Sequence, residues 1–254
     1  MTRSAATAVA FDPTVYPVTD DMAESLFQKL VILMLLPLVR RWLHERGVKA
    51  LVGANQFIYG EQFNPKGSSA APDLYVLPGL DPDTEVTCWK VWETGLAPSF
   101  ALEVVSRDIK KDYEQGPERY NSLRARELII FDRDYAESDH RVRWQVWRRT
   151  KNRGLVQIEH TNDDRVFSKE LGCWLRAVGD GVNERVRIAT GVHGDELIPT
   201  AEEREAAERH ARLAAEQARL AAERAREDER RLRLAAEDEL TRLREELERL
   251  KRAR

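Results

Sequence analysis

The C-terminal stretch of this sequence, residues 201–254, constrains the fold more than any other feature. It contains neither glycine nor proline, and arginine recurs every seven residues, at positions 212, 219, 226 and 233. A sustained seven-residue repeat without a helix breaker is typical of one long helix with coiled-coil character. The pattern therefore predicts a separate charged helix over residues 201–254.

Two interpretations of this helix remain open. Its apolar side is mostly alanine and strengthens to leucine only at its end, at Leu240, Leu243, Leu247 and Leu250. Such a seam predicts a homo-oligomer formed through residues 201–254. Because alanine buries little surface, the alternative is a solvated single helix held by Glu–Arg pairs at four-residue spacing.

The compact part of the chain must then lie before residue 201. We expect an N-terminal lead-in over residues 1–18 and one domain over residues 19–200. Acidic and basic residues balance within residues 201–254, so the net charge of −3 belongs to residues 1–200. A protein that binds nucleic acid usually presents a basic surface. Here only local stretches, residues 107–111 and 141–153, could supply one, and each is otherwise a solvated face.

Cysteines and apolar runs indicate the compartment. Cys88 and Cys173 lie far apart without metal-ligand spacing, which argues against a zinc site and a disulfide framework. The longest apolar run, residues 30–39, is interrupted by Pro37 and is shorter than the roughly 20 residues of a membrane span. We expect a soluble cytoplasmic protein without a membrane partner.

Residues 19–200 contain alternating helix and strand patterns. The first helix is expected from about residues 19–21 to Gly47, and a second over residues 112–126. The second lies between two apolar strands, residues 99–106 and 127–131. A strand–helix–strand order predicts a parallel crossover, hence an α/β fold with a mixed sheet flanked by helices.

Other segments of the domain are expected to be strands, at residues 50–52, 56–59, 73–77, 141–148, 155–160 and 186–188. The last three show short alternating patterns and are expected to complete the sheet as antiparallel strands. Residues 81–97 do not decide between a strand and a hydrophobic lid.

Two carboxylates carry the candidate chemistry. Glu103 is the one acidic residue inside an apolar strand, where an ionised side chain must be paired, hydrogen-bonded or metal-bound. A structural ion pair with an arginine is the alternative to a functional role. Asp73 opens another strand, and two carboxylates on adjacent strands can share Mg²⁺, or Mn²⁺ in its place. Together they predict a metal site that polarises a phosphate and activates a water.

A family resemblance rests on an ordered set of phrases: APDLYVLPG, FALEVVSRDIKKDY, RYNSLRARELIIFD, LGCWLR and TGVHGDELIPTAEE. They resemble the Uma-type restriction endonuclease family, in the PD-(D/E)XK nuclease superfamily, over about residues 20–200. The resemblance implies a restriction-endonuclease-like core that hydrolyses nucleic acid, foremost DNA, with Mg²⁺. Asp73 matches the aspartate of the family's PD motif and Glu103 the acidic residue of its EVxS strand. Asp112 and Tyr120 match landmarks of its helix.

The sequence departs from this family at the lysine. The expected positions hold Val105 and Gly116. A lysine there would orient the attacking water or stabilise the developing negative charge. Lys111, which abuts Asp112, is the candidate replacement, with Lys110 beside it, and both are otherwise a solvent-facing pair.

Two functions follow from these residues. The first is a metal-dependent endonuclease with Asp73, Glu103 and Lys111 as catalytic residues and the two carboxylates as metal ligands. Glu24 is a further acidic candidate in the first helix. The second is a catalytically degraded nuclease fold that binds nucleic acid or protein and oligomerises through residues 201–254.

Overall fold

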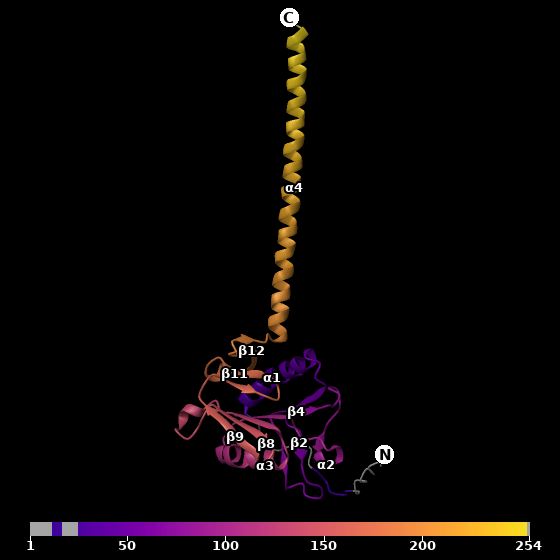
Figure 1. Ribbon diagram of the computed structural model, residues 1–254. Coiled ribbons are helices and arrows are strands. Elements are labelled where there is room, and N and C mark those ends of the chain that lie inside the picture. Colours follow the sequence, from indigo (N-terminus) through magenta and orange to yellow (C-terminus); the bar gives the residue numbers. More distant parts are fainter. Residues whose placement is uncertain (1–11, 17–24, 253–254) are drawn as a thin grey trace. The chain divides into compact units, whose positions relative to one another are not determined.

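A computed structural model describes residues 12–16 and 25–252 of the chain (Figure 1). The chain divides into two compact units, Met1–Ile198 and Pro199–Arg254, each described here by itself. The first unit contains the sheets and the shorter helices, and the second is one helix. The α/β fold with a mixed sheet and a long C-terminal helix is thereby confirmed.

The first helix, α1 (Leu26–Glu45), begins at a capping box. The Ser25 hydroxyl accepts from the Gln28 amide at 3.1 Å, and the Gln28 side chain accepts from the Ser25 amide at 2.9 Å. These reciprocal bonds satisfy amides that a helix start otherwise leaves exposed. The helix ends before Gly47, whose φ of +68° suits glycine. The expected start at residues 19–21 and the candidate Glu24 lie outside the described residues.

The main sheet has six strands in the order β1–β4–β6–β7–β8–β9. Their bounds are β1 (Ala50–Gly53), β4 (Leu74–Pro78), β6 (Phe100–Val104), β7 (Glu127–Phe131), β8 (Trp144–Thr150) and β9 (Gly154–Thr161). Only β6 and β7 pair in parallel within this sheet, and its other neighbours are antiparallel. The expected crossover between residues 99–106 and 127–131 is confirmed.

The crossover is shorter and less regular than the helix expected over residues 112–126. It begins with a π-helical turn, η1 (Lys111–Gln115), and continues as α3 (Gly116–Ser122). In the π turn the Gly116 amide donates to the Lys111 carbonyl. The following Pro117 has no amide hydrogen to donate. The helix ends early because Arg124 adopts a φ of +61°, which turns the chain into β7.

Two smaller sheets accompany the main one. One has the order β3–β2–β5, from β3 (Ser69–Ala70), β2 (Phe57–Tyr59) and β5 (Cys88–Lys90). The other has the order β10–β11–β12–β13, from β10 (Arg165–Ser168), β11 (Cys173–Val178), β12 (Arg185–Thr190) and β13 (Glu196–Leu197). Residues 81–97 thus contain both a strand, β5, and a short helix, α2 (Val91–Thr94).

The expectation that residues 186–188 complete the main sheet is wrong. They belong to β12, which pairs with β11 and β13. The side chains of Val186 and Ile188 join α1 and one face of the main sheet in a single apolar core. Burial against α1 thus explains the alternating pattern of this segment, which by itself does not specify the strand's partners.

A second core covers the other face of the main sheet. It contains Tyr75, Ala101 and Ile130 from the sheet, together with Tyr120 of α3 and Leu123 just after it. Both faces of β4, β6 and β7 are therefore buried. This explains why their sequences are nearly continuous apolar runs instead of alternating ones.

The C-terminal unit is α4 (Ala201–Arg252), a helix of 52 residues. A capping box joins Thr200 and Glu203 at its start. Its large apolar side chains are exposed, among them Leu240, Leu243 and Leu247. Ion pairs at three- or four-residue spacing run along it, such as Arg233–Glu237 at 3.0 Å. Within residues 12–16 and 25–252, no helix is long and apolar enough to cross a membrane.

Candidate active site

Asp73 and Glu103 lie close together at the end of the β4–β6 pairing. Leu74, the first residue of β4, stands opposite Leu102 of β6. Asp73 directly precedes β4, so the strand expected over residues 73–77 begins one residue later, and Glu103 follows Leu102 within β6. The Val104 amide donates to Asp73 Oδ2 at 2.6 Å, which holds the aspartate over the end of β6.

The net effect of the surroundings of the Glu103 carboxylate is to disfavour its ionisation. Burial raises its pKa well above the usual 4.5, and the negative charges of Asp73 and Asp112 raise it further. The Tyr120 hydroxyl, which donates to Glu103 Oε1, lowers the pKa, as does the Lys111 ammonium. Two neighbouring carboxylates do not both ionise readily. They either share a proton or need a cation between them.

The alternative of a structural arginine pair does not describe Glu103. Throughout the part of the chain that the structure describes, no arginine forms an ion pair with it. Its hydrogen-bond donor is Tyr120, a fully buried residue whose own pKa is raised well above 10 by burial and by Glu103. The phenol therefore stays protonated and fixes the position of the carboxylate.

Asp112 anchors the segment that follows β6. It is buried, and its Oδ2 accepts from the Ser106 amide at 2.7 Å and from the Ser106 hydroxyl at 2.8 Å. These bonds tie the π turn to the end of β6. Among the described residues, no group of three or more His, Cys, Asp or Glu is arranged to hold a metal ion.

The two candidate lysines have different surroundings. Lys110 is exposed, whereas Lys111 is partly buried and its charge lowers the pKa of Glu103. Lys111 is also the first residue of the π turn, a feature that often occurs at functional sites. The positions where the family pattern places lysine hold no charged side chain: Val105 packs on the second core, and Gly116 is buried.

The basic stretch of residues 141–153 is only partly a solvated face. Arg141 pairs with buried Asp132 at 2.6 Å, and Arg148 pairs with buried Glu127 at 2.7 Å. Sequence reasoning missed Glu127, although it begins an apolar strand and is fully buried. The sequence pattern that singled out Glu103, an acidic residue next to an apolar run, is also present at Glu127.

Comparisons with known proteins include a distant structural likeness. No family model matches the sequence, and no curated protein matches it. Among solved structures, the chain is similar to a putative nuclease belonging to DUF820 from Anabaena variabilis ATCC 29413. The identity is 11%, the TM-score is 0.41, and the match covers 59% of this chain and 75% of the other.

Proposed function

We propose that the first unit is a metal-dependent nuclease that hydrolyses phosphodiester bonds in nucleic acid, with DNA as the foremost substrate. The observation that carries the proposal is a pair of neighbouring carboxylates, Asp73 just before β4 and Glu103 within β6, close enough for the charge of Asp73 to raise the pKa of Glu103. A buried pair of like charges is costly unless something neutralises it. A divalent cation bound between the two carboxylates would neutralise this charge.

The donor set fits Mg²⁺ or Mn²⁺. Asp73 and Glu103 offer carboxylate oxygens, the ligands that hard cations prefer, and Mg²⁺ in proteins commonly uses one or two carboxylates and keeps several waters. When bound, the ion would polarise the phosphate and lower the pKa of a coordinated water.

The remaining residues of the site would position these ligands and complement charge. Tyr120 holds Glu103 through its hydroxyl, and the Ser106–Asp112 bonds hold the start of the crossover in place. Lys111 brings a cation close to Glu103. In the proposed reaction its ammonium stabilises the negative charge that develops on the phosphate.

A cleavage assay with paired variants tests the proposal. Supercoiled plasmid, single-stranded DNA and RNA are incubated with the full chain and Mg²⁺ or Mn²⁺. We expect Asp73→Asn and Glu103→Gln to abolish cleavage, and Lys111→Met to slow it by roughly 10²–10³-fold. Lys110→Met is the matched control and should cleave like the wild type. Cleavage that persists in both carboxylate variants would refute the proposal.

We also infer that α4 associates with a second copy of the chain. Leu240, Leu243 and Leu247 are exposed at the alternating three- and four-residue spacing of a coiled-coil seam. The single-helix alternative has support of its own, because ion pairs within the helix, such as Arg219–Glu223, need no partner. Deletion of residues 199–254 separates the two, because only the first interpretation expects the mass in solution to fall.

A further inference from the structure

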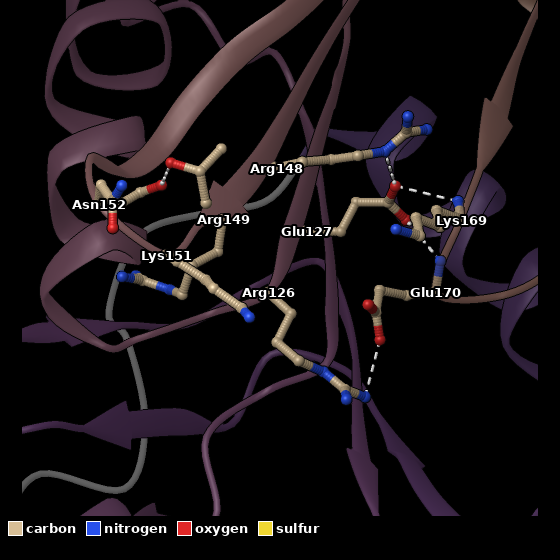
Figure 2. A pocket seen from close by; sticks show the side chains of 10 residues that line it. Arg126, Glu127, Arg148, Arg149, Lys151, Asn152, Lys169 and Glu170 are labelled. Carbon is tan, nitrogen blue, oxygen red and sulfur yellow. Dashed lines mark hydrogen bonds and ion pairs between the residues drawn. The ribbon is translucent and has the colours of Figure 1, made fainter.

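A pocket of about 460 Å³, called here the basic pocket, lies where the start of β7 meets the end of β8 (Figure 2). Three segments form it: the start of β7, the β8–β9 hairpin, and the residues after β10. Its lining residues are Arg126, Glu127, Arg148, Arg149, Thr150, Lys151, Asn152, Gly154, Lys169 and Glu170. Five of these side chains are cationic and two are acidic.

The basic pocket is separate from the candidate active site. Glu127 pairs with Phe100 at one end of the parallel strands β6 and β7, and Glu103 pairs with Ile130 three residues further on. Three residues of strand span roughly 10 Å. Glu127 also faces the opposite side of the sheet, where it accepts from Ser168 of β10.

Both acidic groups of the pocket are already neutralised. Glu127 is fully buried and accepts from Arg148 Nε at 2.7 Å and from the backbone amides of Lys169 and Glu170 at 3.0 and 3.2 Å. Glu170 pairs with Arg126 at 2.7 Å. Figure 2 shows these interactions along one side of the pocket. The two carboxylates are thus matched by Arg148 and Arg126.

The remaining cations are Arg149, Lys151 and Lys169. Arg149 is partly buried, and its guanidinium donates to the carbonyls of Ala125 at 2.9 Å and Asn121 at 2.7 Å, which carry no charge. Within the described residues, no carboxylate forms an ion pair with Arg149 or Lys151. Two backbone carbonyls therefore hold a guanidinium in place without neutralising it.

The electrostatics of Arg149 agree with this geometry. Burial lowers its pKa, and the nearby charge of Arg124 lowers it further. Neither effect is offset by a neighbouring carboxylate among the causes of the shift. An anion entering the pocket would relieve them, and a guanidinium with free N–H groups is suited to phosphate oxygens.

We propose that the basic pocket binds a phosphate group, as a monoester or a diester, through Arg149, Lys151 and Lys169. Its volume lies within the roughly 300–1,000 Å³ of small-molecule sites, enough for a nucleotide or for one nucleotide of a longer strand. The site needs no metal and does not use Asp73 or Glu103. It therefore stands or fails independently of the proposed nuclease activity.

Binding measurements in EDTA test this site with the full chain. The probes are a fluorescein-labelled single-stranded 12-mer, followed by fluorescence polarisation, and inorganic pyrophosphate, followed by calorimetry. Lys151→Glu reverses one charge in the pocket. Arg153→Glu makes the same change on the same hairpin at an exposed residue that does not line the pocket, and is the matched control. Thermal unfolding of both variants verifies that they fold.

We expect at least one probe to bind the wild type and Lys151→Glu to weaken it by about fivefold or more, with Arg153→Glu close to the wild type. If the 12-mer binds and pyrophosphate competes weakly, the phosphate belongs to a polynucleotide, and Lys151→Glu should also lower the salt slope by about one. If pyrophosphate binds and the 12-mer does not, the ligand is a small phosphate compound. Absence of binding by both probes, or equal losses in the two variants, would overturn the proposal.

Discussion

Replacement of Glu103 by glutamine should stabilise the metal-free protein at neutral pH. Glutamine keeps an oxygen that can accept from Tyr120, and its amide can donate toward Asp73. The substitution removes the repulsion between the neighbouring carboxylates of Asp73 and Glu103. The same change should abolish the proposed metal site, so stability and activity would move in opposite directions.

The magnitude follows from Coulomb's law for two like charges in contact. Two unit charges about 4 Å apart repel by ~1 kcal/mol in water and by ~4 kcal/mol at an effective dielectric constant of 20. Glu103 is partly buried, so its repulsion from Asp73 should lie between these limits. A unit of about 200 residues shifts its melting temperature by roughly 2–4 °C per kcal/mol. We therefore expect a gain of several degrees.

The pH dependence has a definite sign. The pKa of Glu103 in the folded state lies above its usual 4.5, so the folded state binds the proton more tightly than the unfolded state. This proton contributes stability that is fully present below about pH 4.5 and is lost as the pH rises through the folded-state pKa. The advantage of Glu103→Gln should thus be largest at neutral pH and shrink toward acid.

Differential scanning calorimetry in EDTA from pH 4 to pH 8 measures the effect. Saturating Mn²⁺ should raise the melting temperature of the wild type, because a ligand that binds only the folded state stabilises it, and should leave Glu103→Gln nearly unchanged. Glu114→Gln removes an exposed carboxylate from the same region and serves as the control. If Glu103→Gln melts at or below the wild-type temperature at pH 7, or if Mn²⁺ stabilises both proteins equally, the argument from charge repulsion is refuted.

Three further predictions concern other parts of the molecule. Tyr120→Phe removes the bond that lowers the pKa of Glu103, so the pH profile of cleavage should move to higher pH, and an unchanged profile would contradict the positioning role. Glu127→Ala leaves the Arg148 guanidinium without its carboxylate and should cost about 3–5 kcal/mol in urea unfolding, where a loss below ~1 kcal/mol would show the pair to be dispensable. Deletion of residues 199–254 should reduce an oligomer to a monomer in light scattering, and an unchanged mass would favour the single-helix interpretation.

The parts of the fold that the sequence predicted are those that local patterns determine. The absence of glycine and proline and the seven-residue repeat predicted α4, because helix formation depends on neighbours along the chain. The apolar runs at residues 99–106 and 127–131 predicted β6, β7 and their parallel crossover for a similar reason. The partner of β12 was predicted wrongly, because strand pairing depends on residues far away in the sequence.

The candidate active site was also predicted from sequence only in part. Sequence alone singled out Asp73 and Glu103, because a charged residue in an apolar run is costly wherever the strand packs. Only the pairing of β4 with β6 brings Asp73 close to Glu103, and only the folded crossover brings the charge of Lys111 close enough to lower the pKa of Glu103.

The basic pocket was decided entirely by tertiary structure. Its cations come from segments around residues 126, 149 and 169, whereas the sequence predicted only that the stretch 141–153 is either a local basic patch or a solvated face. Folding neutralises some of these charges with buried carboxylates and leaves others, such as Arg149, held by carbonyl groups alone. Sequence thus determined which charges the chain carries, whereas the packing of distant segments decided which of them remain uncompensated, because electrostatic interactions depend on distance in space.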